Sequence, residues 1–399
     1  MCLSGVCTFR KRQTNTDMMK KIKTLALAVC MMTASGAVAQ TTPEEVKSPI
    51  VAEKTAEWYD NQTKAWGEVV KTDPNNENAW RNYYQAAFYK RWYNETDSTA
   101  LTVLAEMKKA VPDSYIYNYC AFREYMGAPE DTIYAEKAIA RMPEKMGYDE
   151  YNTWLAYYAK ENDTHRLADI CKAYYESGQY SPGILQYNYN ELQGMDEGGI
   201  YIGIGDAVLI PKWLLQYGKG VHTDKIIVCA PFLFMRNYRE HLFQQLGIGD
   251  APEPKKPVTD TESGDEYINL LLDTIRRKSG RPLYFSPLGS TDPWLDNLYN
   301  EGLLLKYSDK PYDNMAVKRR NVEQRYLLEY LRESFVPDNW TSGNRLSANY
   351  VVMLSDLLPY YKTHDKARYE WLMATLRGAI KRAALPLDME NKYLKMLDK

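Results

Sequence analysis

The stretch GGIYIGIGDAVLIPKWLLQYGKGVHTDKIIVCAPF, residues 198–232, has the pattern of a strand, a glycine-bearing loop, a helix and a second strand. Its apolar run Ile200–Ile204 suits a strand that is covered on both faces, and Lys225–Phe232 suits a second one. Between them, Pro211 predicts the start of a helix, because proline is best tolerated in the first helical turn. Two strands joined through a helix form a parallel pair with a right-handed connection. The stretch therefore predicts a small parallel α/β domain.

The rest of this domain follows in sequence, and we expect it to span residues 196–312. A proline- and charge-rich surface loop over 249–265 interrupts the pattern. The further predicted elements are helices over 238–246, 266–278 and 293–300 and strands over 282–285 and 302–307.

The natural ligand position in such a domain is the crevice beyond the carboxyl ends of the strands. The candidate ligand-binding residues there are Gly205, Asp206, Ser286 and Asp292. Asp206 also has a structural interpretation, because an aspartate can accept backbone N–H bonds at a helix start. Ser286 and Asp292 are equally typical of turns.

The glycines of this loop do not predict a nucleotide site. Val208 stands where a dinucleotide fingerprint has its third glycine, and no Lys-Ser/Thr pair follows.

The run G-D-x₄-P-x-W-x₂-Q, followed by G-V-x-T-D, lies at residues 205–224. It resembles the soluble C-terminal part of transmembrane protein 260-like proteins, and weaker similar fragments extend the resemblance over about 196–360. That family is associated with protein O-mannosylation, and its Bacteroidetes members carry a multipass glycosyltransferase-like membrane region ahead of this part. Ile204, Ala207 and Val208 replace the polar Asn, Asn and Asp of the family pattern N-G-D-N-D-T. The resemblance thus implies the fold of the soluble part, and it does not carry over a transferase activity.

Residues 55–195 show helical periodicity interrupted by proline-containing breaks, the first at Asp73–Asn76. The breaks divide the region into four predicted helical hairpins, 55–92, 98–127, 130–160 and 163–194. Their length and the Asp-Pro-Asn turn resemble tetratricopeptide repeats, which stack into a superhelix. Aromatic residues of such a superhelix can line a groove for a peptide or glycan, or they can be packing between helices. The candidate groove residues are Tyr117, Trp154 and Tyr158.

The last part of the chain, residues 313–399, predicts a helical cap on the α/β domain. We expect a long helix over 314–335, an antiparallel pair over 345–361 and 366–384, and a short closing helix over 389–397. The predicted fold class is therefore α+α/β.

Residues 1–39 have the pattern of a signal peptide. Lys20, Lys21 and Lys23 precede the apolar run 24–32, and Ala37-Val38-Ala39 is a small-x-small cleavage signal. We expect cleavage after Ala39, with residues 40–54 as a flexible lead-in and with Met18 or Met19 as the natural start. A lipoprotein acylated on Cys30 is the alternative. No later run has the roughly 18 apolar residues that a membrane helix needs, so the sequence predicts a periplasmic or secreted protein.

Composition limits the possible partners and cofactors. Removal of residues 1–39 leaves 44 basic and 51 acidic residues, a net charge of −7, which disfavours nucleic acids and anionic membranes. Cys120, Cys171 and Cys229 remain, and they form no CxxC and no Cys/His cluster. We interpret them as buried small side chains, with a Cys120–Cys171 disulfide as the alternative. The sequence predicts no metal site and no cofactor.

No catalytic residue is predicted, because the four histidines after residue 39 have no metal-ligand spacing and no GxSxG motif precedes a helix. The first hypothesis is an exported, non-catalytic interaction protein of the bacterial cell envelope that binds a protein, peptide or glycan. The alternative is an enzyme or accessory subunit of envelope glycan or glycoprotein processing, which acts at the crevice around Asp206.

Overall fold

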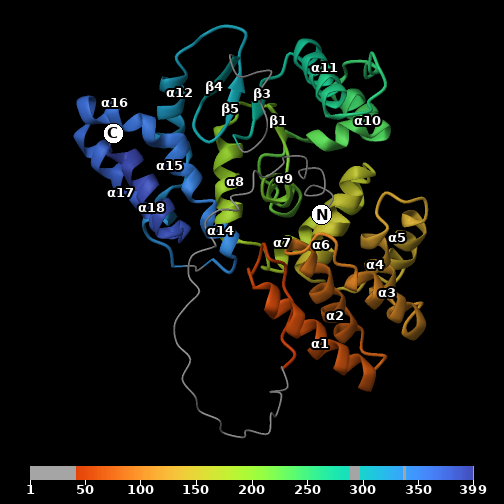
Figure 1. The fold of residues 1–399 in the computed structure, drawn as a ribbon. Helices are drawn as coiled ribbons and strands as arrows, with labels where there is room; N and C mark the ends of the chain where they lie inside the picture. The colour runs from red at the N-terminus through yellow and green to blue at the C-terminus, as the bar shows by residue number, and fades with distance from the viewer. Residues whose placement is uncertain (1–41, 288–296, 336–337, 399) are drawn as a thin grey trace, which may run out of the picture. The chain divides into compact units, whose positions relative to one another are not determined.

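The computed structural model describes residues 42–287, 297–335 and 338–398, shown in Figure 1. The chain divides into two compact units. The N-terminal unit comprises residues 42–49 and 53–145, and the C-terminal unit comprises residues 50–52 and 146–398. The expected boundary at residue 195 is therefore not where the units divide. The predicted signal peptide lies outside the described residues.

The N-terminal unit consists of helices with polar caps. Thr55, Asn76 and Ser114 each accept a backbone N–H of the following helix, which satisfies one of its unpaired N-terminal donors. Helix α2 packs on both α1 and α3, and α4 packs on α5. The elements are α1 (Ala56–Thr72), α2 (Glu77–Tyr89), a 3₁₀ turn (Lys90–Trp92), α3 (Thr99–Ala110), α4 (Tyr115–Glu124) and α5 (Asp131–Ile139).

The C-terminal unit begins with α6 (Tyr148–Lys160), α7 (Thr164–Glu176) and α8 (Pro182–Gly194). Helix α6 lies within the predicted hairpin 130–160, and α7 and α8 lie within the predicted hairpin 163–194, but their packing partners differ from those of the expected hairpins. Helix α6 packs on α7, α7 packs on a π-helical turn (Leu214–Gly218), and α8 packs on α9 (Asp206–Trp213). The predicted hairpin over 130–160 is divided between the two units, since α5 belongs to one and α6 to the other.

The sheet of this unit is mixed, which corrects the predicted parallel sheet. Its order is β2-β1-β3-β5-β4, in which β1 is parallel to β2 and β3 while β5 is antiparallel to β3 and β4. A tight turn closed by the Glu301 N–H and the Leu304 carbonyl, 3.1 Å apart, joins β4 to β5. Such a short connection permits only antiparallel pairing. The strands are β1 (Ile200–Gly203), β2 (Ile226–Cys229), β3 (Leu283–Phe285), β4 (Leu298–Asn300) and β5 (Leu305–Tyr307).

One predicted helix of this region is replaced by strand. Residues 298–300, expected at the end of a helix over 293–300, form β4, and residues 293–296 lie outside the described residues.

Helix α9 begins at Asp206, five residues before the expected start at Pro211. A proline inside a helix leaves the carbonyl four residues earlier without its donor. Here that carbonyl belongs to Ala207, and the Asn188 side-chain amide of α8 donates to it at 2.9 Å. The hydrogen bond from Asn188 thus makes Pro211 tolerable inside the helix.

Two helices lie between β2 and β3 in the chain. Helix α11 begins with a capping box in which Asp260 and Ser263 each accept from the other's backbone, and it ends at Gly280 in the left-handed region. Helix α11 therefore starts five residues before the expected Glu266. The two helices are α10 (Arg236–Leu246), which follows a 3₁₀ turn (Ala230–Phe234), and α11 (Thr261–Ser279).

The predicted long helix over 314–335 is broken. Helix α12 (Asn314–Arg320) continues as a π-helical turn (Asn321–Arg325), and the chain is extended at Tyr326 before α13 (Glu329–Arg332). The Asn190 side chain of α8 explains the break, because it donates to the Leu327 carbonyl at 3.0 Å and accepts from the Leu327 N–H at 2.9 Å. These two hydrogen bonds replace those of a helix.

The remaining helices form one apolar core, as expected. Leu354, Leu357, Leu372 and Leu376 are fully buried together, and Figure 1 shows α15, α17 and α18 gathered in this part of the unit. The helices are α14 (Thr341–Arg345), α15 (Ala348–Leu354), a 3₁₀ turn (Ser355–Leu357), α16 (Leu358–His364), α17 (Lys366–Ala383) and α18 (Leu387–Leu397).

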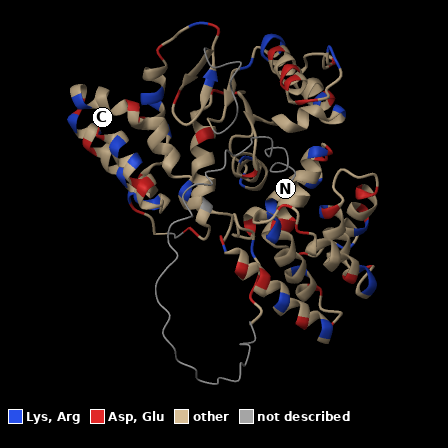
Figure 2. Cartoon of the chain, in the orientation of Figure 1, with Lys and Arg blue, Asp and Glu red and all other residues tan. Residues whose placement is uncertain are grey.

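Charge and cysteine usage agree with a globular chain. Figure 2 shows acidic and basic side chains mixed along the helices of each unit. Among the described residues, no helix is long and apolar enough to cross a membrane. Cys120, Cys171 and Cys229 are buried and none of them is in a disulfide, so the structure lacks the alternative Cys120–Cys171 bridge.

Candidate functional site

The carboxyl end of β1 carries two of the expected ligand-binding residues. Gly205 has φ +106° and ψ 149°, a conformation that is essentially restricted to glycine, and it leads the chain from β1 straight into α9. Asp206 is the first residue of α9 and is partly exposed, so its carboxylate lies at the positive end of the helix dipole.

The charge of Asp206 acts on three tyrosines of the same unit. Burial raises the pKa of Tyr148, Tyr174 and Tyr180, and the negative charge of Asp206 raises each of these pKa values further. Two of the rings also pack on Trp340, with ring centroids 4.7 Å away for Tyr148 and 4.6 Å for Tyr180. The tyrosines therefore stay neutral hydroxyl groups near a partly exposed carboxylate.

Ser286 does not extend this set to the surface. It is 3% exposed and lies beside Tyr201. Burial and the charge of Glu191 raise the pKa of Tyr201, and the hydrogen bond with Ser286 lowers it. Asp292 lies outside the described residues. The structure thus places Gly205 and Asp206 at the strand end and Ser286 in the interior.

The three predicted groove residues are buried. Tyr117, Trp154 and Tyr158 are 5%, 0% and 4% exposed, so they cannot line an open groove. Their helical periodicity places them on the faces that pack inside their units, which is the packing alternative considered above.

A surface pocket of about 540 Å³ lies instead where the N-terminal unit begins. Its aromatic walls are Trp58, which is partly exposed, and Tyr93, which is 48% exposed. The aromatic pocket is lined by Glu53, Lys54, Thr55, Ala56, Trp58 and Tyr93.

The polar ends of both rings are already used within the protein. The Tyr93 hydroxyl donates to the Lys54 carbonyl, and the Trp58 indole N–H donates to Glu44 at 3.4 Å. The Lys54 ammonium lies 5.1 Å from the centre of the Trp58 ring. These contacts orient the rings, so the surfaces that remain for a ligand are ring faces with one cation beside them.

A second pocket of about 540 Å³ lies along α11 in the C-terminal unit. Asp273 stands at its edge but is fully engaged: Arg276 contacts one carboxylate oxygen at 2.9 Å and Arg277 the other at 2.7 Å. The lining residues are Pro254, Lys255, Lys256, Ser263, Glu266, Tyr267, Asn269, Leu270 and Asp273.

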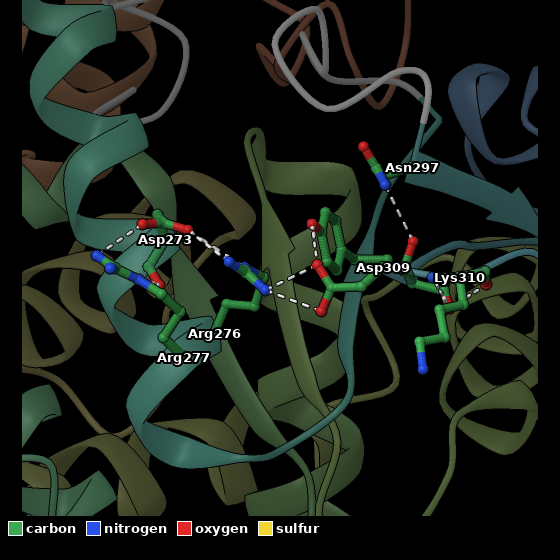
Figure 3. A network of polar contacts seen from close by, with 8 residues as sticks. Asp273, Arg276, Arg277, Asn297, Asp309 and Lys310 are labelled. Carbon is green, nitrogen blue, oxygen red and sulfur yellow. Dashed lines mark hydrogen bonds and ion pairs between the residues drawn. The ribbon is translucent and has the colours of Figure 1, made fainter.

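Figure 3 shows how Asp273 belongs to a polar clamp. Arg276 donates to both oxygens of Asp309 at 3.0 Å, and its guanidinium lies over the Tyr307 ring. The clamp fastens α11 to the end of β5. Its charges therefore have a structural use, and the α11 pocket lacks a free functional group from this network.

One ion pair is completely enclosed. The ammonium of Lys212 in α9 contacts Glu191 of α8, lies 2.5 Å from Asn188 Oδ1 and 2.9 Å from the Val208 carbonyl, and sits 4.0 Å from the centre of the Tyr201 ring. The side chains of Lys212 and Glu191 are 0% exposed. Burial lowers the pKa of Lys212 and raises that of Glu191, while each partner opposes the shift of the other.

A second charged group lies near the sheet edge. Lys306 of β5 is 2.6 Å from Asp196 Oδ2 and 3.6 Å from Glu301 Oε1. Burial raises the pKa of Glu301. Burial alone would also raise the pKa of Asp196, but the hydrogen bond and charge of Lys306 lower it. The pKa values of the two carboxyl groups beside Lys306 are thus shifted in opposite directions, that of Glu301 up and that of Asp196 down.

Sequence reasoning missed these groups for separate reasons. Lys212 had a usable signal, because it stands inside the apolar run Val208–Trp213, where a lysine needs a buried partner. Trp58 has helical spacing with the core positions of α1, so its exposure could not be read from the pattern. Asp196 and Lys306 are 110 positions apart and had no local signal.

No known protein family, curated protein or solved structure matches this chain.

Proposed function

We propose that this chain is an exported, non-catalytic binding protein of the bacterial cell envelope, with a tetratricopeptide-like helical scaffold that holds a peptide or glycan in the aromatic pocket. One observation carries the proposal: the pocket brings together the partly exposed Trp58 ring, the exposed Tyr93 ring and the Lys54 ammonium. Ligand sites typically combine such apolar walls with a few placed polar groups.

The size of the pocket supports a small ligand or a short segment of a larger one. A volume of about 540 Å³ falls within the roughly 300–1,000 Å³ of typical ligand sites. Protein–protein interfaces, in contrast, cover about 800 Å² on each partner. A peptide segment or an oligosaccharide of a few residues therefore suits the pocket better than a folded protein surface.

Variants of the aromatic walls test this function. We expect Trp58→Ala and Tyr93→Ala each to weaken binding of envelope oligosaccharides or peptides by at least about tenfold, because aromatic anchors dominate binding energy. The measurement is calorimetric titration of the full chain with peptidoglycan fragments in one arm and an envelope peptide digest in the other.

Trp92 provides a matched control, because it is 56% exposed and adjacent in sequence to Tyr93 but does not line the pocket. Trp92→Ala should bind like the wild type. Equal losses in the Trp58 and Trp92 variants, or unchanged binding in all three, would contradict the proposal.

Export is part of the proposal and rests on the pattern of residues 1–39. N-terminal sequencing of the protein from its native host should begin near Gln40. A sequence that begins at Met18 or Met19 would remove the envelope from the proposed function.

An enzyme or accessory subunit of glycan processing is the second candidate, and the set around Asp206 favours it. A partly exposed carboxylate near neutral tyrosine hydroxyls has groups that could bind or activate a hydroxylated substrate. Asp206→Asn separates the candidates: unchanged ligand binding with loss of glycan turnover supports the enzyme, and no effect on either supports the binding protein.

A further inference from the structure

Glu301 is a carboxylate without a complete set of partners. It lies in the turn between β4 and β5, and its side chain is 3% exposed. The Tyr312 hydroxyl donates to Oε1 at 2.7 Å, whereas Oε2 is buried and has no hydrogen-bond partner among the described residues. A buried polar atom that lacks a partner requires an explanation.

The nearest cation does not resolve this deficit. The Lys306 ammonium lies 2.6 Å from Asp196 but 3.6 Å from Glu301, so its strong hydrogen bond goes to Asp196. Ionised Glu301 would therefore be a buried negative charge with only part of a counter-charge, which is costly.

Among the described residues, the other charged and titratable groups around Glu301 do not supply a further cation close to Oε2. The groups that face it are Lys306 of β5, Asp196 after α8, Tyr312 before α12, Tyr284 of β3 and Tyr326 after the π-helical turn, while Arg320 of α12 acts on Asp196. The tyrosines can donate hydrogen bonds but carry no positive charge.

The turn that holds Glu301 is tied to the chain after α12 through its backbone. The Asn321 amide donates to the Glu301 carbonyl at 2.7 Å, and the Leu303 N–H donates to the Tyr326 hydroxyl at 3.1 Å. Asn321 is also fully buried, and its Oδ1 has no partner among the described residues. The turn that carries the Glu301 side chain is therefore held by hydrogen bonds to this segment.

We propose that Glu301 is the proton-binding residue of a latch: with a proton on its carboxyl group the β4–β5 hairpin stays closed on Asn321 and Tyr326, and loss of the proton loosens it. A neutral carboxyl group needs no counter-ion, so Lys306 pairs with Asp196 alone. Ionisation places an uncompensated charge inside the closed turn, and opening exposes that charge to water.

The direction of the pH effect follows from the raised pKa of Glu301, whose cause is burial. A carboxyl group whose pKa is higher in the closed than in the open state stabilises the closed state fully below the open-state value, about pH 4.3. This stabilisation is lost as pH rises through the closed-state pKa. The hairpin should therefore open more readily above about pH 4.3 and reach a constant level above the closed-state pKa.

Hydrogen exchange of the full chain tests the latch. Between pH 4.5 and 8, the protection factor of a peptide covering residues 298–307 should fall by up to about tenfold per pH unit, because one proton is released, and then level off. In Glu301→Gln, which keeps the shape but cannot ionise, the protection factor should not change with pH. Peptides from β1 and β2 report on general stability and should respond equally in both proteins.

Two further variants keep the test decisive if Glu301→Gln does not fold. Asp196→Asn frees Lys306 for Glu301, so the protection factor of residues 298–307 should become constant at a lower pH than in the wild type. Tyr312→Phe removes a hydrogen-bond donor to ionised Glu301, so the protection factor should become constant at a higher pH than in the wild type. The latch is overturned if wild type and Glu301→Gln share one pH profile, or if these two variants leave the wild-type profile unchanged.

Discussion

Lys212 and Lys306 lie over the same face of the sheet but have different surroundings. Tyr201 and Tyr284 are paired neighbours in β1 and β3, and the ammonium of Lys212 lies 4.0 Å from the first ring while that of Lys306 lies 5.6 Å from the second. Lys212 is enclosed with every donor bonded, whereas Lys306 is 21% exposed and shared between two carboxylates.

This difference shows which of the two sites can bind or release a proton. The bonds of Lys212 tie α9 to α8, so its role is structural, and any change in it strains the interior. Lys306 satisfies Asp196 and leaves Glu301 short of a partner, so its surroundings can take up a proton. A lysine next to a glutamate therefore has a purely structural role at Lys212 and Glu191, whereas at Lys306 the neighbouring Glu301 can bind a proton.

The largest expected effect is on Lys212. Lys212→Met should destabilise the C-terminal unit by about 3–5 kcal/mol, because it leaves Glu191 as a buried charge without its partner. Urea unfolding followed by circular dichroism measures this loss. A loss below about 1 kcal/mol would show that Glu191 is not ionised in the folded protein and would end the comparison.

Removing both charges should cost less than removing one. The double variant Lys212→Met/Glu191→Leu is expected to regain at least about half of the lost stability, since apolar replacement of a buried pair is often nearly neutral. The same urea titration gives the free energy of unfolding. Additive losses in the two single variants would mean that Lys212 and Glu191 do not act as a pair.

The smallest expected effect is on Asp196, which is 38% exposed. Asp196→Asn should cost about 1 kcal/mol or less near pH 6, because solvent screens a partly exposed ion pair. The Asp196 pKa is lowered, so its contribution is present above the unfolded value of about 3.9 and is lost as pH falls through the folded pKa. Wild type and variant should thus converge below about pH 4, and a difference that grows there would contradict the pairing with Lys306.

The sequence was a good guide where one local pattern decided the outcome. The strands at Ile200 and Ile226, the face formed by Leu354 and Leu372, and the positions of α6 to α8 all follow from apolar periodicity. Partners far apart in sequence were beyond this reasoning. Asn188 allows α9 to continue past Pro211 through a bond to Ala207, which is 19 positions away. Asn190 ends the helical segment that begins with α12 through bonds to Leu327, which is 137 positions away.

The candidate sites divide in the same way. Gly205 and Asp206 could be placed at a strand end because that position depends on the local strand-to-helix pattern. The buried Tyr117, Trp154 and Tyr158 could not be told from groove residues, because an aromatic stripe has the same spacing in either case. The partial exposure of Trp58 could not be predicted for the same reason.

The π-helical turn at Asn321–Arg325 has a consequence for changes in chain length. Its closing bond joins the Tyr326 N–H to the Asn321 carbonyl at 2.8 Å, so the turn holds one residue more than an α-helical turn. Removing one position here would turn it into an ordinary α-helical turn, and the side chains of α12 before it would keep their places. The same shortening inside α17 would rotate every later residue by about 100° and pull Leu376 and Ile380 out of the core.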